Sequence, residues 1–131
     1  MYDHLLAIAP ETRACFAPPG VDTELFSPGS YQESGYLLSV GRFSDPRKNV
    51  RLLFDAYARL CRALPKVPAL VLVGKAPSHQ DMAHLASLGL TNRVQIFTDV
   101  SQTELVEFYR GACLFILSSD EEGLGIVLVE A

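Results

Sequence analysis

Blocks of apolar and polar residues alternate along the chain from residue 35 onward. Short unbroken apolar runs are typical of strands buried on both sides, and apolar positions spaced three and four residues apart indicate helices with one buried face. The unbroken runs predict strands at residues 35–40, 69–74, 93–97 and 113–117. The spaced positions predict helices at residues 50–64, 80–88 and 101–110, and another that begins near residue 124.

Residues at the ends of these blocks match known helix start and stop signals. Asn49 can cap the helix at residues 50–64, and Pro65 ends it. Ser101 and Glu104 have the spacing of a capping box. The three-and-four spacing predicts one buried face on the helix at 50–64, formed by Leu53, Ala56, Tyr57, Leu60, Cys61 and Leu64.

Strands that alternate with helices predict an α/β fold, a parallel sheet with helices on both faces. In such sheets ligands bind at the carboxyl ends of the strands. The loops at residues 41–49 and 118–125 both follow predicted strands, so we expect them on one edge of the sheet. Residues 10–30 are interrupted by Pro and Gly and predict an irregular segment. We therefore divide the chain into a connecting segment, residues 1–30, and a domain, residues 31–131.

The composition narrows the classes of function. A length of 131 residues corresponds to one domain or part of one. The net charge of -4, without a basic stripe, argues against nucleic acid as a partner. No apolar run approaches the roughly 20 residues of a membrane helix, so any membrane association would be peripheral. Cys15, Cys61 and Cys113 are odd in number and widely spaced, which predicts buried free thiols in a reducing, cytoplasmic compartment and no zinc site.

The loop after the first predicted strand carries three cations, Arg42, Arg47 and Lys48. Cations beside the start of a helix are disfavoured by the helix dipole unless an anion is also present. A phosphate at this edge would be bound by helix N–H groups, an Arg fork and a Lys charge. The alternative is that all three are solvated loop charges.

The loop after the fourth predicted strand is acidic and rich in glycine. Acidic residues at 120–122 stabilise a helix start, and Gly123 and Gly125 allow the backbone to approach a ligand closely. Glu130 comes about two turns into an apolar helix, where a carboxylate is paired, bound to a ligand or at an exposed edge. Carboxylates placed in this way can accept hydrogen bonds from a hydroxyl-rich ligand.

Four segments, in order, resemble one family. Residues 122–131 (EGLGIVLVEA) resemble the glutamate-x7-glutamate motif of the retaining glycosyltransferases of family 4, which have the GT-B fold. Residues 39–49 resemble the Gly-Arg…Lys-Gly loop of that family, and residues 19–28 resemble the start of its C-terminal domain. Residues 93–109 resemble its third strand and the following helix.

The resemblance implies a Rossmann-like, three-layer α/β/α domain that binds a nucleotide-diphosphate sugar. By position, Arg42 and Lys48 would hold the donor diphosphate and stabilise the leaving group. Glu122 would contact the transferred sugar, and Glu130 would accept hydrogen bonds from the ribose hydroxyls. No covalent nucleophile, metal or resident cofactor is implied.

The resemblance extends to weaker contacts. Backbone N–H groups of Gly123, Leu124 and Gly125 would approach the sugar or phosphates, and Val100 and Leu105 would frame the base. The sequence also departs from the family pattern at several positions, namely Pro19 for Asn, Asn49 for Gly, Thr98 for Gly, Ser118 for Pro, and residues 74–77 for a Gly-rich turn.

The chain ends inside a predicted helix, and the family's N-terminal domain, which holds the acceptor site, is absent. We therefore expect a fragment, a partial donor-binding domain that is inactive alone. The donor base, the sugar and the acceptor are left open. The alternative is a non-catalytic module that binds phosphate or another protein, and whether Glu130 and Arg42 face one cleft would separate the two. A flavodoxin-like domain is disfavoured because Arg42 stands where an acidic cluster would be needed.

Overall fold

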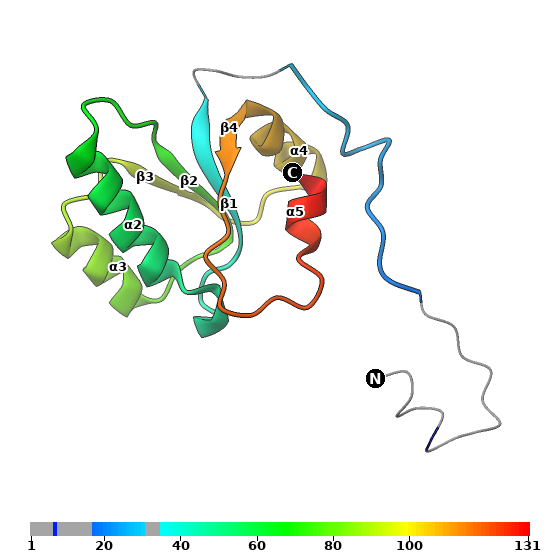
Figure 1. The fold of residues 1–131 in the computed structure, drawn as a ribbon, viewed down its shortest axis with the longest axis horizontal. Coiled ribbons are helices and arrows are strands. Elements are labelled where there is room, and N and C mark those ends of the chain that lie inside the picture. Colours follow the sequence, from blue (N-terminus) through cyan, green and yellow to red (C-terminus); the bar gives the residue numbers. More distant parts are fainter. Residues whose placement is uncertain (1–6, 8–16, 31–34) are drawn as a thin grey trace.

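The computed structural model describes residue 7, residues 17–30 and residues 35–131. Within these residues, four strands form one parallel sheet in the order β3-β2-β1-β4 (Figure 1). The strands are β1 Tyr36–Arg42, β2 Leu70–Lys75, β3 Val94–Phe97 and β4 Ala112–Phe115. The helices are η1 Pro46–Lys48, α2 Val50–Ala63, α3 His79–Ser87, α4 Gln102–Gly111 and α5 Ile126–Glu130. The predicted alternation of strands and helices is confirmed, with ends that differ by two residues or fewer.

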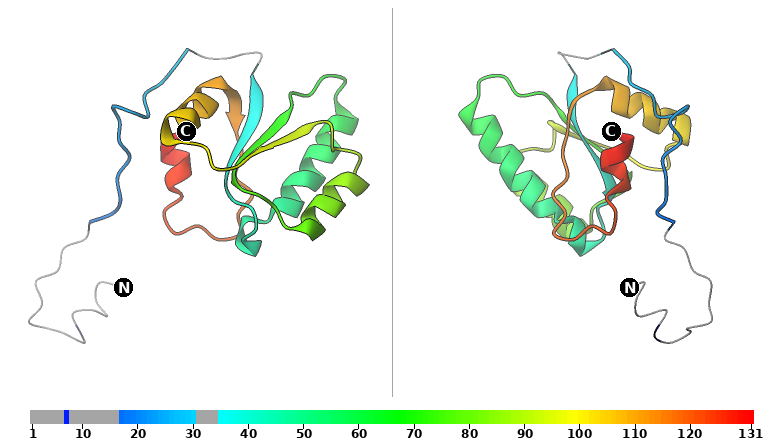
Figure 2. Two further views of the ribbon diagram at one scale, coloured as in Figure 1. Left: turned by 180° about the vertical axis from the view of Figure 1, so that it is seen from behind. Right: turned by 45° about the vertical axis from the view of Figure 1, so that its right-hand side comes forward.

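Helices cover both faces of the sheet, as the two views in Figure 2 show. Leu70 and Leu72 of β2 belong to a core cluster with residues of α2 and α3, whereas Val71 and Val73 belong to a second cluster with residues of α4 and α5. All four side chains are at most 2% exposed. The unbroken apolar run therefore arises because alternate side chains of a strand point into two different cores.

The buried face of α2 differs in part from the prediction. Ala56 and Leu64 are exposed, and Phe54 is completely buried. The buried residues of α2 are Val50, Leu53, Phe54, Tyr57 and Ala58. An aromatic ring gains more from burial than an alanine does, so the helix turns Phe54 toward the sheet and Ala56 toward solvent.

The three cysteines also differ from the prediction in part. Cys61 and Cys113 are free thiols, but each is only partly buried at the margin of the α2 and α3 cluster. Cys15 lies outside the described residues, as does most of the connecting segment before residue 17.

The carboxyl ends of the strands lie at one edge of the sheet, which brings the loops after β1 and β4 together there (Figure 1). This arrangement confirms the prediction that the two loops share an edge. At the same edge Gly41 of β1 pairs in register with Gly74 of β2. Gly74 has a φ of 125°, and a Cβ atom there would lie 2.3 Å from the carbonyl oxygen of Gly41. Glycine is therefore required where these two strands end.

Candidate functional site

The loop between β1 and α2 is built by two caps in succession. Asp45 caps η1, and its carboxylate accepts a hydrogen bond from the backbone N–H of Arg47 at 3.1 Å. Asn49 follows in the left-handed region, with φ 45° and ψ 48°, and its side chain accepts a hydrogen bond from the N–H of Leu52. Asparagine tolerates this conformation better than most residues, so it can stand where the family pattern has glycine.

Four contacts join this loop to the loop after β4. Lys48 Nζ pairs with the carboxylate of Glu122. Asn49 Nδ2 donates to Asp120 Oδ1 at 2.8 Å, and Ser118 Oγ donates to the carbonyl oxygen of Lys48 at 2.9 Å. The backbone N–H of Asp120 donates to the carbonyl oxygen of Arg47, also at 2.9 Å. The two loops, about 70 residues apart in the chain, therefore form one unit.

The cations of the first loop have different surroundings. The Arg47 guanidinium binds the carboxylate of Asp45, with Nη2 to Oδ2 at 2.7 Å, and this pairing lowers the pKa of Asp45 to about 2. Arg42 is exposed at the end of β1, and within the described part of the chain its side chain has no hydrogen bond or ion pair, although its charge also helps to lower the pKa of Asp45. Arg42 is therefore available to an anionic ligand, whereas Arg47 already has a carboxylate partner.

The Lys48 and Glu122 pair is shielded from solvent, with side chains 18% and 26% exposed. The lysine lowers the pKa of the Glu122 carboxyl below its ordinary value of 4.5. The stem of Lys48 passes over Gly41, with Cδ and Cε 3.8 Å from where a Gly41 Cβ would lie. A Cβ atom at residue 41 would make ordinary van der Waals contact with this stem, so the position of the lysine does not require glycine there.

The glycines of the second loop have separate roles. Gly125 has a φ of 63° and begins α5 without a side-chain cap. Gly123 has open space around the position of a Cβ atom, and Leu124 beside it is 52% exposed. Residues 123 and 124 are thus exposed, as backbone contacts to a ligand would require, whereas Gly125 is buried against Leu128.

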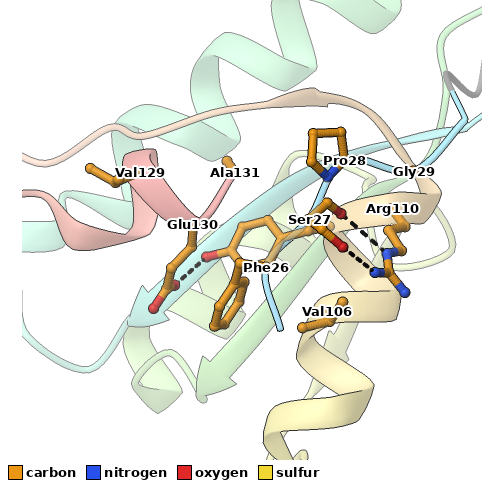
Figure 3. Close-up of a pocket in the computed structure, with 10 residues that line it drawn as sticks. Phe26, Ser27, Pro28, Gly29, Val106, Arg110, Val129, Glu130 and Ala131 are labelled. Atoms are coloured by element: carbon orange, nitrogen blue, oxygen red, sulfur yellow. Dashed lines mark hydrogen bonds between the residues drawn. The ribbon is translucent and has the colours of Figure 1, made fainter. Parts of the chain in front are cut away.

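Glu130 lies at the opposite end of α5 from this loop. Its carboxylate accepts a hydrogen bond from the Tyr109 hydroxyl at 2.8 Å and borders a cavity of 210 Å³ between the connecting segment, α4 and α5 (Figure 3). Arg42 does not line this cavity. Glu130 and Arg42 therefore do not line one cavity, and the shared cleft expected of the donor-binding enzyme is not found among the described residues. A single ligand would have to extend between them to contact both.

Val100, before α4, and Leu105, on α4, are partly buried and pack against the core cluster of that face of the sheet, as do Phe108 and Tyr109 of α4. Val100 also borders an apolar groove with Phe97 and Phe108. The structure does not bring these two residues together with Arg42 and Lys48, and their predicted contact with a base stays a prediction.

The sequence identified the charged residues of the candidate site but not the side chains that contact them and fix their positions. Asn49 was expected only as a cap, and the contacts of Ser118 and Asp120 across the two loops had no sequence signal. Tyr109 and Glu130 are 21 positions apart on different helices, so no spacing rule connects them. Within the described residues, there is no cluster of three or more His, Cys, Asp or Glu side chains suited to a metal, and no helix has the length and apolar character needed to cross a membrane.

A parallel sheet with helices on both faces defines an α/β domain of the class that binds ligands at the carboxyl ends of its strands, where the cationic and acidic loops lie. The family model described as "Glycosyl transferases group 1" matches residues 21–131, and the chain belongs to this family. The Rossmann-like, GT-B type fold predicted from the sequence is confirmed by the solved structures that resemble it.

Two relatives are D-inositol 3-phosphate glycosyltransferases. The protein from Kineococcus radiotolerans is 32% identical over 94% of this chain and 33% of its own length, and the protein from Frankia alni is 31% identical over 98% and 36%. The chain spans about a third of the length of these curated relatives.

Two solved structures are similar. Sucrose-phosphate synthase from Thermosynechococcus elongatus has a TM-score of 0.72 at 22% identity, over 98% of this chain and 35% of that one. WaaG, a glycosyltransferase involved in lipopolysaccharide biosynthesis, has a TM-score of 0.63 at 28% identity, over 76% of this chain and 26% of that one.

The contact between Lys48 and Glu122 is expected to depend on pH. Because the pKa of Glu122 is lowered in the folded protein, the contact is fully formed above about pH 4.5 and weakens as the pH falls through the lowered pKa. Lys48→Met should raise this pKa toward 4.5, whereas the same change at the exposed Lys66 should leave it unchanged. Carboxyl ¹³C NMR titration measures both, and a Glu122 pKa that is insensitive to Lys48→Met would contradict the assignment.

The hydrogen bond between Asn49 and Asp120 is expected to stabilise the two loops together. Asn49→Gly keeps the left-handed backbone but removes the side chain, and should lower the free energy of unfolding by about 1 kcal/mol. Combined with Asp120→Ala, the loss should be smaller than the sum of the two single losses. Urea denaturation measures this, with Asn92→Gly, at an exposed position, as the control that should be additive with Asp120→Ala. Additive losses for Asn49→Gly would show that the bond contributes nothing.

Proposed function

We propose that this chain is the donor-binding part of a retaining glycosyltransferase of family 4, which transfers a sugar from a nucleotide-diphosphate sugar. The observation that carries the proposal is that Lys48 and Glu122 meet in the loops that follow β1 and β4, with Arg42 exposed at the end of β1. The chain leaves β1 toward β2 and returns to its other side as β4, so this is the point where the strand order reverses. Ligands of open α/β sheets bind at such points. Membership of the glycosyltransferase family agrees with it.

The charges of the site suit a diphosphate. Arg42 is exposed and unpaired among the described residues, and Lys48 lies directly before the start of α2. A bound diphosphate would compete with Glu122 for Lys48, because phosphate oxygens carry more charge than one carboxylate. Glu122 would then be released to accept a hydrogen bond from a hydroxyl of the transferred sugar. Binding of the donor would in this way convert an internal ion pair into two contacts with the ligand.

The same cations would assist the reaction. When the bond between sugar and diphosphate breaks, negative charge develops on the leaving diphosphate, and fixed positive groups stabilise that charge. Arg42 and Lys48 would supply those groups, so the proposed reaction requires no metal and no resident cofactor. The proposal assigns no covalent nucleophile, so retention would follow from attack on the face from which the diphosphate departs.

The remainder of the donor would extend along α5. Residues 123 and 124 are exposed, so their backbone N–H groups could contact the sugar or phosphates, and Glu130 has a carboxylate at the surface of a cavity for the ribose hydroxyls. Val100 and Leu105 would lie toward the base. A nucleotide-diphosphate sugar is an extended molecule, which is consistent with Arg42 and Glu130 lying apart.

Binding of a nucleoside diphosphate is the first expected result. Addition of UDP, GDP or ADP to the ¹⁵N-labelled chain should shift amide signals of residues 41–49 and 122–130 for the preferred base. Arg42→Ala should weaken binding about tenfold or more, since it removes a charge-assisted contact. Arg59→Ala, at an exposed position of α2, is the matched control and should change nothing. A folded chain that shows no shifts with any of the three would contradict the donor site.

Sugar transfer by this chain alone is not expected. The chain spans about a third of its relatives, and we propose that the acceptor is bound by another domain of the whole protein. Incubation with a radiolabelled nucleotide sugar and candidate acceptors, inositol phosphate among them, should give product with the full-length protein and none with the purified chain. Product from the chain alone would contradict the proposed division between the two domains.

A further inference from the structure

The side chain of Tyr109 connects three separate parts of the molecule. Its hydroxyl donates to Glu130 Oε2 at 2.8 Å, which links α4 to α5. Its ring meets Phe26 of the connecting segment edge to face, with ring centres 5.9 Å apart, and the ring of Phe115 at 5.7 Å with a tilt of 45°. Packing against two aromatic rings restricts the Tyr109 ring and so the position of its hydroxyl.

The connecting segment is anchored beside Tyr109 by the next residue of α4. Arg110 donates from Nη2 to Ser27 Oγ at 3.0 Å and from Nε to the carbonyl oxygen of Ser27 at 3.4 Å (Figure 3). The stem of Arg110 lies against Gly29, where a Cβ atom would come within 3.1 Å of Arg110 Cγ. Successive residues of α4 thus hold Phe26 and Ser27 in place, and Phe26 in turn supports the Tyr109 ring.

Glu130 depends on this tyrosine for its orientation. Within the described residues, Tyr109 is its hydrogen-bond partner, and Oε1 has none. Burial raises the pKa of the Tyr109 hydroxyl, so it remains a donor at physiological pH. A carboxylate held through Oε2 still presents Oε1, and further lone pairs of Oε2, to a ligand.

We propose that Tyr109 is a positioning residue for the Glu130 carboxylate, holding one oxygen so that the other is presented to the ribose hydroxyls, with Phe26 of the connecting segment supporting its ring. The inference rests on the proposed donor site. It adds that ribose recognition depends on α4 and on the segment that precedes the sheet, neither of which contacts the diphosphate. A flexible glutamate would lose side-chain entropy on binding, whereas a fixed one loses little.

The test compares two ligands on the purified chain by NMR titration or calorimetry. Tyr109→Phe keeps the ring and removes only the hydroxyl. It should weaken binding of the preferred nucleoside diphosphate about three- to tenfold and leave binding of inorganic pyrophosphate, which has no ribose, unchanged. In a Glu130→Gln background, Tyr109→Phe should cause a much smaller further loss, because the carboxylate that it orients is gone.

Tyr57→Phe is the matched control, since it also removes a buried hydroxyl donor, to the carbonyl oxygen of Pro68 at 2.8 Å, but on the opposite face of the sheet. It should leave both affinities unchanged. If Tyr109→Phe weakened the binding of nucleotide and of pyrophosphate equally, this would indicate a general loss of structure and overturn the inference. An unchanged nucleotide affinity in Tyr109→Phe would also overturn the inference, but it would leave the proposed donor site intact. Absence of nucleotide binding by the unsubstituted chain would reject the donor site and this inference together.

Discussion

β1 pairs in parallel with a strand on each side, and this pairing determines where every part of the candidate site lies. β1 is bonded to β2 on one side and β4 on the other, so the chain must cross from one half of the sheet to the other between β3 and β4. The loops that follow β1 and β4 are thereby brought to the same edge, on either side of the reversal point. All other contacts of the site, including the ion pair and the hydrogen bonds between the loops, depend on this arrangement.

In the structure, most charged side chains of the candidate site already have a partner within the protein. Lys48 is neutralised by Glu122, Arg47 by Asp45, and Glu130 is bound by a neutral hydroxyl. Partly shielded charges that lacked partners would reduce stability, so these pairings favour the folded state. Arg42 has no such partner among the described residues and lies in solvent, where an unpaired charge costs little. An anionic ligand would encounter this charge first.

Two of the departures from the family pattern take part in joining the loops. Asn49 has the left-handed backbone that glycine would adopt, and it adds a side chain that caps α2 and reaches Asp120. Ser118 has a hydroxyl that bonds to the carbonyl oxygen of Lys48, a contact that proline cannot make. At both positions the family residue, glycine or proline, acts mainly through its backbone conformation. Here it is replaced by a residue whose side chain donates a hydrogen bond. Lys48 is thus held from the backbone as well as through its ammonium group.

The sequence by itself determined the order of strands and helices, the common edge of the two loops and the chemical nature of Arg42, Lys48 and Glu122. Local patterns carry this information, because caps, apolar periodicity and the rule that ligands bind at strand ends involve residues near one another in the chain. The sequence predicted the buried face of α2 only in part. It assigned Ala56 to that face and left out Phe54, although a phenylalanine ring gains more from burial than an alanine methyl group. Only the tertiary structure decided that Glu122 pairs with Lys48, that Asn49 reaches Asp120 and that Tyr109 holds Glu130. These partners are separated by 74, 71 and 21 positions, and their approach depends on how whole elements pack against the sheet.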